Sequence, residues 1–200
     1  MIRAVILDIG GVLEYTPPTG HTAAWEAELG LAEGELDRRM LDVWRGGSLG
    51  TISEEEVHAA IVARLGLSPA DLDRFLAGVW EEYLGSPNTE LVAWFAGLRP
   101  RYRTGIVSNS FVGARERESE RYGFEDLTDT IVYSHEVGVV KPDPAIYLLA
   151  CDRLGVRPEE VVFLDDREPA VEGARAVGMS AVLYRDNAQA IGEVELLLAG

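Results

Sequence analysis

The sequence has few of the residues that build covalently linked or membrane-spanning scaffolds. It contains one cysteine, Cys151, which excludes an internal disulfide framework, so we expect a reducing, cytoplasmic location. No apolar run is long enough to cross a membrane, and the first residues lead into a strand pattern rather than a signal peptide. We therefore expect no membrane partner.

Positive charge is also scarce. The chain has 18 basic and 34 acidic residues, which gives a formal net charge of −16 at pH 7. Because a polyphosphate backbone binds to a basic surface, this balance argues against a nucleic-acid partner. Of the 18 basic residues, 17 are arginines and one is a lysine, Lys141. That lysine is either a chance occurrence or marks a place where a compact ammonium fits and a planar guanidinium does not.

Strand and helix patterns alternate along most of the chain. Residues 4–7 form a short apolar run that predicts a buried strand, and further strands are expected at 104–107, 130–133, 161–164 and 181–184. Helices are expected at 89–98, 112–122, 143–154 and 168–177. This alternation predicts an α/β fold, a Rossmann-like parallel sheet with helices on both faces.

A helical block follows the first strand and lies between two breaker-rich segments, 16–20 and 85–88. Its helices are expected at 23–29, 35–45, 53–65 and 69–84, with Gly46 and Gly47 ending the second of them. Ser53 and Glu56 form a capping box for the third helix. We predict a core domain of residues 1–15 and 88–200, and an inserted α-helical cap of residues 16–87.

Polar groups follow the predicted strands, namely Asp8, Ser108-Asn109, Lys141 and Asp165-Asp166. Because parallel strands end at the same edge of a sheet, these groups can converge. Three carboxylates that lie together repel one another, and an all-oxygen ligand set suits Mg²⁺. The serine, asparagine and lysine suit phosphate oxygens. Asp8 could then accept a phosphoryl group as a covalent nucleophile, while Gly10 and Gly11 let the backbone turn sharply toward a ligand.

The same motifs resemble a known family. The order Asp8-x-Gly-Gly-Val, Val107-Ser108-Asn109, Lys141-Pro142 and Asp165-Asp166 with Gly178-Met179 is similar to the haloacid dehalogenase-like hydrolase superfamily. The resemblance covers residues 1–15 and 88–190, and the inserted helices match the position of that family's small α-helical cap.

The resemblance implies a role for each motif. Asp8 would be the nucleophile, and Ser108 and Lys141 would hold the phosphoryl group. Mg²⁺ would be bound by Asp8, the backbone carbonyl of Gly10, and the pair Asp165 and Asp166. The implied substrate is a small phosphorylated metabolite, and no oligomeric state is predicted.

Two positions depart from the family pattern. In most of its phosphatases a second aspartate, two residues after the nucleophile, protonates the leaving group, and here that position is Gly10. Loss of a general acid typically costs ~10²–10⁴-fold in rate. At residues 46–56 and 141–147 the sequence also resembles a branch of the family that has Asp-x-Gly in its first motif and is similar to bacterial sugar 1-phosphate phosphatases. A sugar 1-phosphate has a better leaving group than the phosphate ester of an ordinary alcohol, so its cleavage depends less on a general acid. A second departure is Ala170, where many relatives carry Asn.

Several other residues invite a functional interpretation. Glu14 and His21 could supply a substitute acid, but as linker residues we expect both to be solvated. The cap residues Trp25, Trp44 and Trp80 are expected to pack between helices rather than to line a substrate pocket. Residues 116–121 are expected to form a solvated, charged helix face.

Three functions remain open at this point. The favoured one is an Mg²⁺-dependent phosphatase that acts through an aspartyl-phosphate on a small metabolite, a sugar phosphate among them. A 2-haloacid dehalogenase needs no metal, and the paired Asp165 and Asp166 argue against it because close carboxylates without a cation repel. A non-catalytic binding protein on the same fold is favoured by Gly10 and opposed by the intact Asp8, Ser108, Lys141 and acidic pair.

Overall fold

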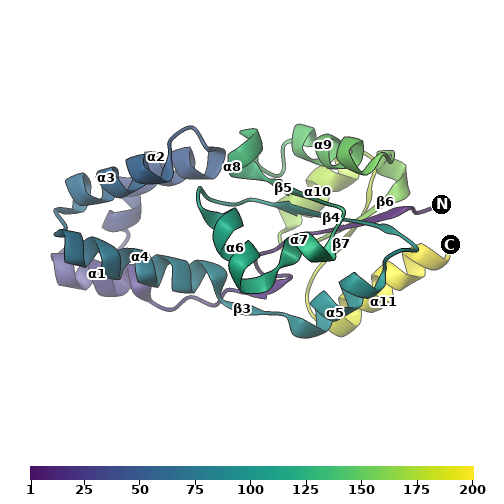
Figure 1. The fold of residues 1–200 in the computed structure, drawn as a ribbon, viewed down its shortest axis with the longest axis horizontal. Coiled ribbons are helices and arrows are strands. Elements are labelled where there is room, and N and C mark those ends of the chain that lie inside the picture. The colour runs from purple at the N-terminus through teal and green to yellow at the C-terminus, as the bar shows by residue number, and fades with distance from the viewer.

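A five-stranded parallel sheet forms the centre of the computed structural model, which describes residues 1–200 (Figure 1). The strand order is β5-β4-β1-β6-β7. The strands are β1 (Ala4–Leu7), β4 (Arg103–Ser108), β5 (Thr130–Tyr133), β6 (Val161–Asp165) and β7 (Ser180–Leu183). The predicted α/β class with a parallel, Rossmann-like sheet is confirmed.

Helices cover both faces of this sheet (Figure 1). One face carries α8 (Ser134–Val137), α9 (Pro144–Leu154) and α10 (Glu168–Ala176). The other carries α5 (Thr89–Gly97), α6 (Ala114–Tyr122), α7 (Phe124–Leu127) and α11 (Asn187–Ala199). A single 3₁₀ turn at Pro158–Glu160 leads into β6.

The central strand β1 is held by an apolar core on each side. Because successive side chains of a strand point to opposite faces, Val5 and Leu7 pack with α5 and α11, while Ala4 and Ile6 pack with α9 and α10. All four side chains are fully buried. The residue that follows β1 is therefore fixed at the edge of a rigid sheet.

The helices α1 (His21–Leu29), α2 (Glu35–Leu49), α3 (Glu54–Leu65) and α4 (Pro69–Leu84) lie at the end of the molecule away from the termini (Figure 1). They enclose an apolar cluster of their own, which includes Trp25, Met40, Ile61 and Phe75. The capping box of Ser53 and Glu56 at the start of α3 is confirmed. The two linkers to this helical unit pair with each other, as β2 (Glu14–Tyr15) runs antiparallel to β3 (Ser86–Pro87).

The helix α2 does not end at Gly46 and Gly47, as the sequence suggested, but continues to Leu49. Both glycines are buried inside the helix, and a Cβ on Gly47 would overlap the ring of Phe111, which follows β4. These glycines therefore allow α2 to pack closely against the loop after β4. Gly50 caps the C-terminus of the helix with a left-handed φ of 64°.

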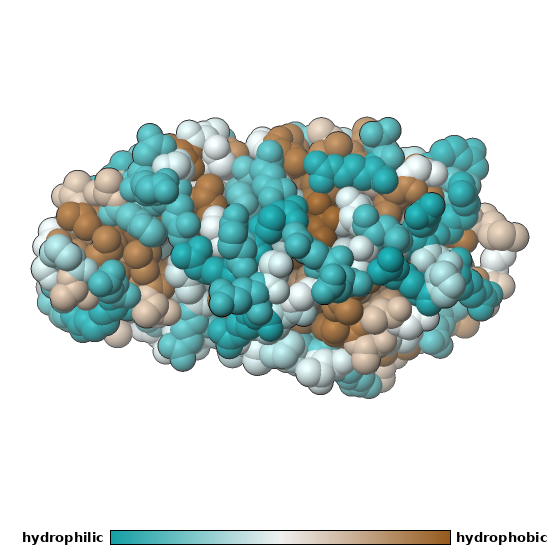
Figure 2. All heavy atoms as spheres, in the orientation of Figure 1, coloured by the Kyte–Doolittle hydropathy of each residue, from teal (hydrophilic) through white to brown (hydrophobic).

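The surface is mostly polar. On the face drawn in Figure 2, hydrophilic residues cover α6 and α7, and apolar residues form small, separate patches. Among the residues of α6, Glu116 and Glu120 are exposed but Glu118 is fully buried. The expectation that 116–121 is a solvated face is therefore wrong at Glu118. No helix combines the length and apolar character needed to cross a bilayer.

Candidate active site

Asp8 directly follows β1, and its carboxylate lies against the chain's one lysine. Lys141 Nζ is 2.7 Å from Asp8 Oδ1 and 2.6 Å from Asp165 Oδ2. Asp8 and Asp165 are adjacent because β1 and β6 are neighbours in register, with Leu7 paired to Leu164. Asp8 and Lys141 are each 6% exposed, and Asp165 is fully buried. The ammonium thus bridges two buried carboxylates.

Burial and neighbouring charges shift the pKa values of this pair. Burial raises the pKa of Asp8 to about 7, with Asp165 acting in the same direction and Lys141 opposing both. Burial works against the charge of Lys141, but the carboxylates of Asp8 and Asp165 outweigh it and raise the lysine pKa above its ordinary value. Lys141 therefore keeps its proton at neutral pH and provides a fixed positive charge beside Asp8.

Ser108 and Asn109 reach the same edge from β4, the other neighbour of β1. Asn109 Oδ1 accepts a hydrogen bond from the backbone N–H of Lys141 at 2.7 Å, and Asn109 Nδ2 donates to the Lys141 carbonyl at 3.0 Å. Asn109 thereby fixes the backbone that carries the ammonium. Ser108 is 3% exposed and ends β4 beside Asp8. The structure thus brings Ser108, Asn109 and Lys141 together around Asp8.

A third carboxylate completes an acidic cluster at this edge. Asp8, Asp165 and Asp166 each offer an oxygen, and these oxygens lie within 4.8 Å of one another. Burial, and after it the charge of Asp165, raises the pKa of Asp166. Three carboxylate oxygens at this spacing fit a hard divalent cation, which takes oxygen ligands and relieves their repulsion.

The two glycines after Asp8 have different roles. Gly11 has a left-handed φ of 77°, and a Cβ there would overlap the Asp166 carboxylate. Gly10 does not have a positive φ, and a Cβ there would meet no atom within 4 Å. The expectation that both glycines are needed for the turn is therefore wrong for Gly10, which leaves open space at the wall of a cavity.

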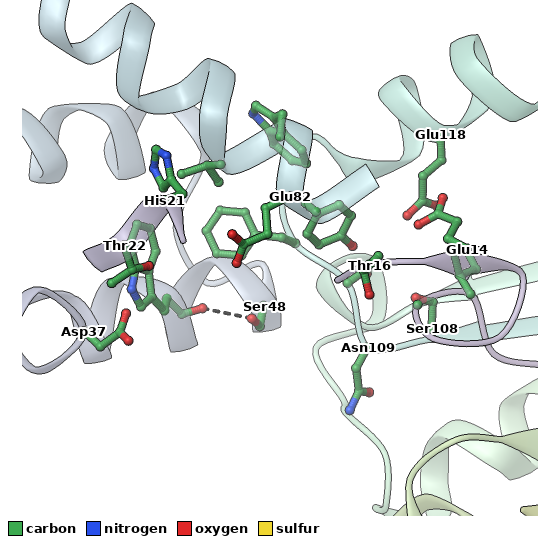
Figure 3. A pocket seen from close by; sticks show the side chains of 18 of the residues that line it. Glu14, Thr16, His21, Thr22, Asp37, Ser48, Glu82, Ser108, Asn109 and Glu118 are labelled. Atoms are coloured by element: carbon green, nitrogen blue, oxygen red, sulfur yellow. Dashed lines mark hydrogen bonds between the residues drawn. The ribbon is translucent and has the colours of Figure 1, made fainter. Parts of the chain in front are cut away.

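The cavity has a volume of about 470 Å³ and lies between the sheet edge and the helices α1, α2 and α4 (Figure 3). Ser108, Asn109 and Gly10 line its sheet side, and His21, Trp44 and Trp80 line its helical side. The expectation of pure helix packing is thus wrong for Trp44 and Trp80. It holds for Trp25, which packs edge-on against Phe75 with ring centroids 5.3 Å apart.

Glu14 and Glu118 point toward each other at the sheet side of this cavity (Figure 3). Glu14 is 1% exposed and Glu118 is fully buried. Glu118 Oε2 accepts a hydrogen bond from the Tyr133 hydroxyl at 2.6 Å, whereas Glu118 Oε1 and both oxygens of Glu14 have no partner. Burial, followed by the charges of Glu118 and Asp8, raises the pKa of Glu14 to about 9. Burial also raises the pKa of Glu118 to about 7.

The expected solvation of Glu14 and His21 is therefore wrong. Glu14 is buried because the β2–β3 pairing folds the first linker back onto the core. His21 is partly buried against the ring of Phe75, with centroids 5.0 Å apart. Sequence reasoning missed Glu118, although one signal was available. Glu118 stands four residues after the buried Ala114 and four before Tyr122, so it belongs to the inward-facing stripe of α6.

The similarity of this chain to known proteins identifies its family. A family model described as haloacid dehalogenase-like hydrolase matches residues 2–178. The chain belongs to the haloacid dehalogenase-like hydrolase family. It is 45% identical over 212 residues to Bifunctional epoxide hydrolase 2 of Sus scrofa, a match that covers 97% of this chain and 38% of that protein. The chain thus spans well under half the length of that relative.

Two further relatives match along nearly their whole length. The chain is 29% identical over 183 residues to the fructose-1-phosphate phosphatase YqaB of Escherichia coli, covering 90% of this chain and 95% of the relative. A haloacid dehalogenase family enzyme of Bacteroides thetaiotaomicron, solved with magnesium and inorganic phosphate, superposes with a TM-score of 0.79. At 21% identity over 92% of this chain and 95% of that one, this match shows a shared fold.

Proposed function

We propose that this hydrolase is an Mg²⁺-dependent phosphatase that cleaves a small phosphorylated metabolite through an aspartyl-phosphate. The observation that carries the proposal is the 2.7 Å contact of Asp8 Oδ1 with Lys141 Nζ, inside a cluster of three carboxylate oxygens within 4.8 Å. A carboxylate beside a fixed ammonium and a cation site can attack phosphorus while positive charge offsets that of the phosphoryl oxygens. The phosphatase relative and the magnesium–phosphate complex of the Bacteroides enzyme support it.

Each residue of the site has its own role in the proposed reaction. Asp8 Oδ1 already accepts a hydrogen bond from the Ile9 N–H at 2.8 Å and lies against Lys141, so Oδ2 is the oxygen left for attack. Attack forms an Asp8–phosphorus bond as the ester bond breaks, and the leaving oxygen departs with a negative charge and then takes a proton from water. Water then attacks phosphorus and releases inorganic phosphate and free Asp8. Lys141 and the Ser108 hydroxyl hold the phosphoryl oxygens, and Asn109 positions Lys141.

The metal site would draw on the same sheet edge. Asp8, Asp165, Asp166 and the Gly10 carbonyl would hold Mg²⁺, which when bound supplies positive charge next to the phosphoryl group. Because Asp165 also contacts Lys141, it keeps the ammonium and the cation site next to each other. The same acidic cluster leaves a metal-free dehalogenase with little support, since Lys141 alone would have to offset three close carboxylates.

The inserted helices are proposed to act as the cap over the site, with residues 16–87 forming that unit and residues 1–15 and 88–200 the core. The cavity of about 470 Å³ that they enclose has room for a leaving group as large as a monosaccharide. A sugar phosphate is therefore within the proposed range of substrates. The cytoplasmic location stays a prediction.

The test is the Asp8→Asn variant, assayed with p-nitrophenyl phosphate and Mg²⁺. We expect turnover to vanish while the thermal unfolding midpoint stays within a few degrees, because asparagine fills the same space but cannot form the acyl phosphate. Asp152→Asn, at an exposed position outside the site, is the matched control and should keep full activity. Retention of most activity in Asp8→Asn would rule out the covalent mechanism. Metal-independent halide release from 2-chloropropionate would favour the dehalogenase instead.

A further inference from the structure

The cavity that would hold the leaving group is acidic. Its lining contains four acidic residues, Glu14, Asp37, Glu82 and Glu118, and no lysine or arginine. Because the phosphoryl end of a substrate would be held by Lys141 and a cation, the rest of the substrate would meet only neutral and acidic groups. A second anionic group on the substrate is therefore disfavoured.

Of these four residues, Glu14 and Glu118 are buried and have carboxyl oxygens without a hydrogen-bond partner. Asp37 is exposed, and Glu82 accepts a hydrogen bond from the Thr19 N–H at 2.9 Å. Glu14 and Glu118 are at least nine-tenths buried, and together they present three oxygens without a hydrogen-bond partner to the cavity. Buried polar atoms are normally paired, so an unpaired set of acceptors that faces a cavity favours a ligand that donates to all of them.

No cation of the protein makes a hydrogen bond to these oxygens. Arg115 is bound to Glu125 and Glu136, and Arg121 donates to the Gly85 carbonyl at 3.0 Å. Glu14 forms a β-bridge with Gly10, which stands two residues after the nucleophile, and Glu118 points toward Glu14 (Figure 3). The group that pairs with them would therefore lie close to the ester oxygen of the substrate.

We propose that the substrate's leaving group carries a cationic amino group near the ester oxygen, and that Glu14 and Glu118 bind this ammonium. An ammonium has three N–H donors, enough for the three unpaired oxygens once the cation has displaced the proton that burial keeps on Glu14. The ligand class is a phosphate monoester of an amino alcohol or amino sugar, and the inference rests on the proposed phosphatase function.

Unreactive phosphonates separate binding from the chemical step. We would measure inhibition of p-nitrophenyl phosphate hydrolysis at pH 7 by 3-aminopropylphosphonate and by 3-hydroxypropylphosphonate, which have equal length and differ only in ammonium against hydroxyl. The amine should bind about tenfold or more tightly, the size of effect expected from a charge-assisted hydrogen bond. The carboxylate analogue 3-phosphonopropionate should bind most weakly of the three.

Three variants assign the preference to residues. Glu14→Gln and Glu118→Gln should each bring the inhibition constants of the amine and the alcohol close to equality, because each removes an acceptor for the ammonium. Glu120→Gln removes the same charge from an exposed position on the same helix as Glu118, and it should keep the wild-type preference.

The possible outcomes separate the inference from the proposed function. If p-nitrophenyl phosphate is not hydrolysed by the wild type, the phosphatase proposal fails. If it is hydrolysed but the alcohol inhibits as well as the amine, the phosphatase stands and the ammonium site is wrong. If the glutamate variants do not fold, the wild-type ratio alone decides. A preference that survives in both folded variants would also overturn the assignment.

Discussion

Lys141 Nζ and Asp8 Oδ1 lie 2.7 Å apart at the sheet edge, with both side chains buried. The same ammonium contacts Asp165, and its nitrogen lies 5.7 Å from the ring centroid of Phe163. The lysine ammonium therefore lies in a narrow, buried site between two carboxylates. This arrangement explains why a chain that otherwise uses arginine carries its one lysine here, because a planar guanidinium is wider than an ammonium.

Replacement of Lys141 should damage activity and stability together. In Lys141→Met the two buried carboxylates lose their partner, which typically costs about 3–5 kcal/mol of the free energy of unfolding. Lys141→Arg keeps the charge but should lower kcat roughly 100-fold or more, because the fork displaces Asp8. Urea denaturation and steady-state kinetics measure the two effects. Arg185→Met, at an exposed site, is the control, and wild-type kcat in Lys141→Arg would contradict the account.

Magnesium binding should depend on Asp166, the most accessible carboxylate of the acidic cluster. Calorimetry with Mg²⁺ should show one binding event in the wild type and none in Asp166→Ala, because the cluster loses one of its three charged ligands. Asp152→Ala removes a comparable charge from the surface and should bind Mg²⁺ as the wild type does. Equal affinity in Asp166→Ala and the wild type would mean that the cation binds elsewhere.

Much of the sheet edge could be predicted because it depends on local rules. Asp8 directly follows a strand, Ser108 and Asp165 each end one, and the ends of parallel strands share an edge whatever the loops between them do. The different roles of Gly10 and Gly11 could not be predicted, because they depend on the position of the Asp166 side chain, which follows β6, a strand far from Gly10 in the sequence.

The acidic wall of the cavity could not be predicted for a similar reason. Glu14 looks like a linker residue until β2 pairs with β3, a contact between segments far apart in the sequence. Glu118 lies in a helix with charged residues on every side, so the weak apolar stripe of Ala114 and Tyr122 was hidden. Burial of a charged residue against a cavity is a tertiary effect that contradicts local patterning.

The stability of the protein should fall as pH rises through the neutral range. Glu14 has a folded-state pKa of about 9 against an ordinary value of 4.5, so between these values the folded state keeps a proton that the unfolded chain releases. Its contribution is fully present below about pH 4.5 and is lost as pH rises toward about 9. One such group can change the free energy of unfolding by at most about 1.4 kcal/mol per pH unit.

Urea denaturation from pH 5 to pH 9, without added divalent cations, measures this slope. Glu14→Gln should make the decline shallower, and the decline that remains should end near pH 7, because burial raises the pKa of both Glu118 and Asp8 to about 7. Glu120→Gln, exposed on α6, should keep the wild-type slope. A stability profile that is flat in the wild type would mean that Glu14 is ionised in the folded state.

The open position at Gly10 gives a direct test of the missing acid. Unassisted departure places full negative charge on the leaving oxygen, so the wild-type rate should depend steeply on the pKa of the leaving alcohol. Gly10→Asp should flatten that dependence and accelerate alkyl phosphates, by up to ~10²-fold or more, because a carboxylic acid there can protonate the leaving oxygen. The substitution is tolerable in the structure, since a Cβ at Gly10 meets no atom within 4 Å and φ is not positive.

Gly10→Asn is the matched control for this prediction, because it has the shape of aspartate without a proton to give. A series of aryl and alkyl phosphates should show the same steep dependence in Gly10→Asn as in the wild type. A flat dependence in the wild type would mean that another group already protonates the leaving oxygen. The buried Glu14, which holds a proton at neutral pH, would be the first residue to test, and His21 the second. A wild type that hydrolyses no phosphate ester of the series, activated or not, would support a non-catalytic role for the fold.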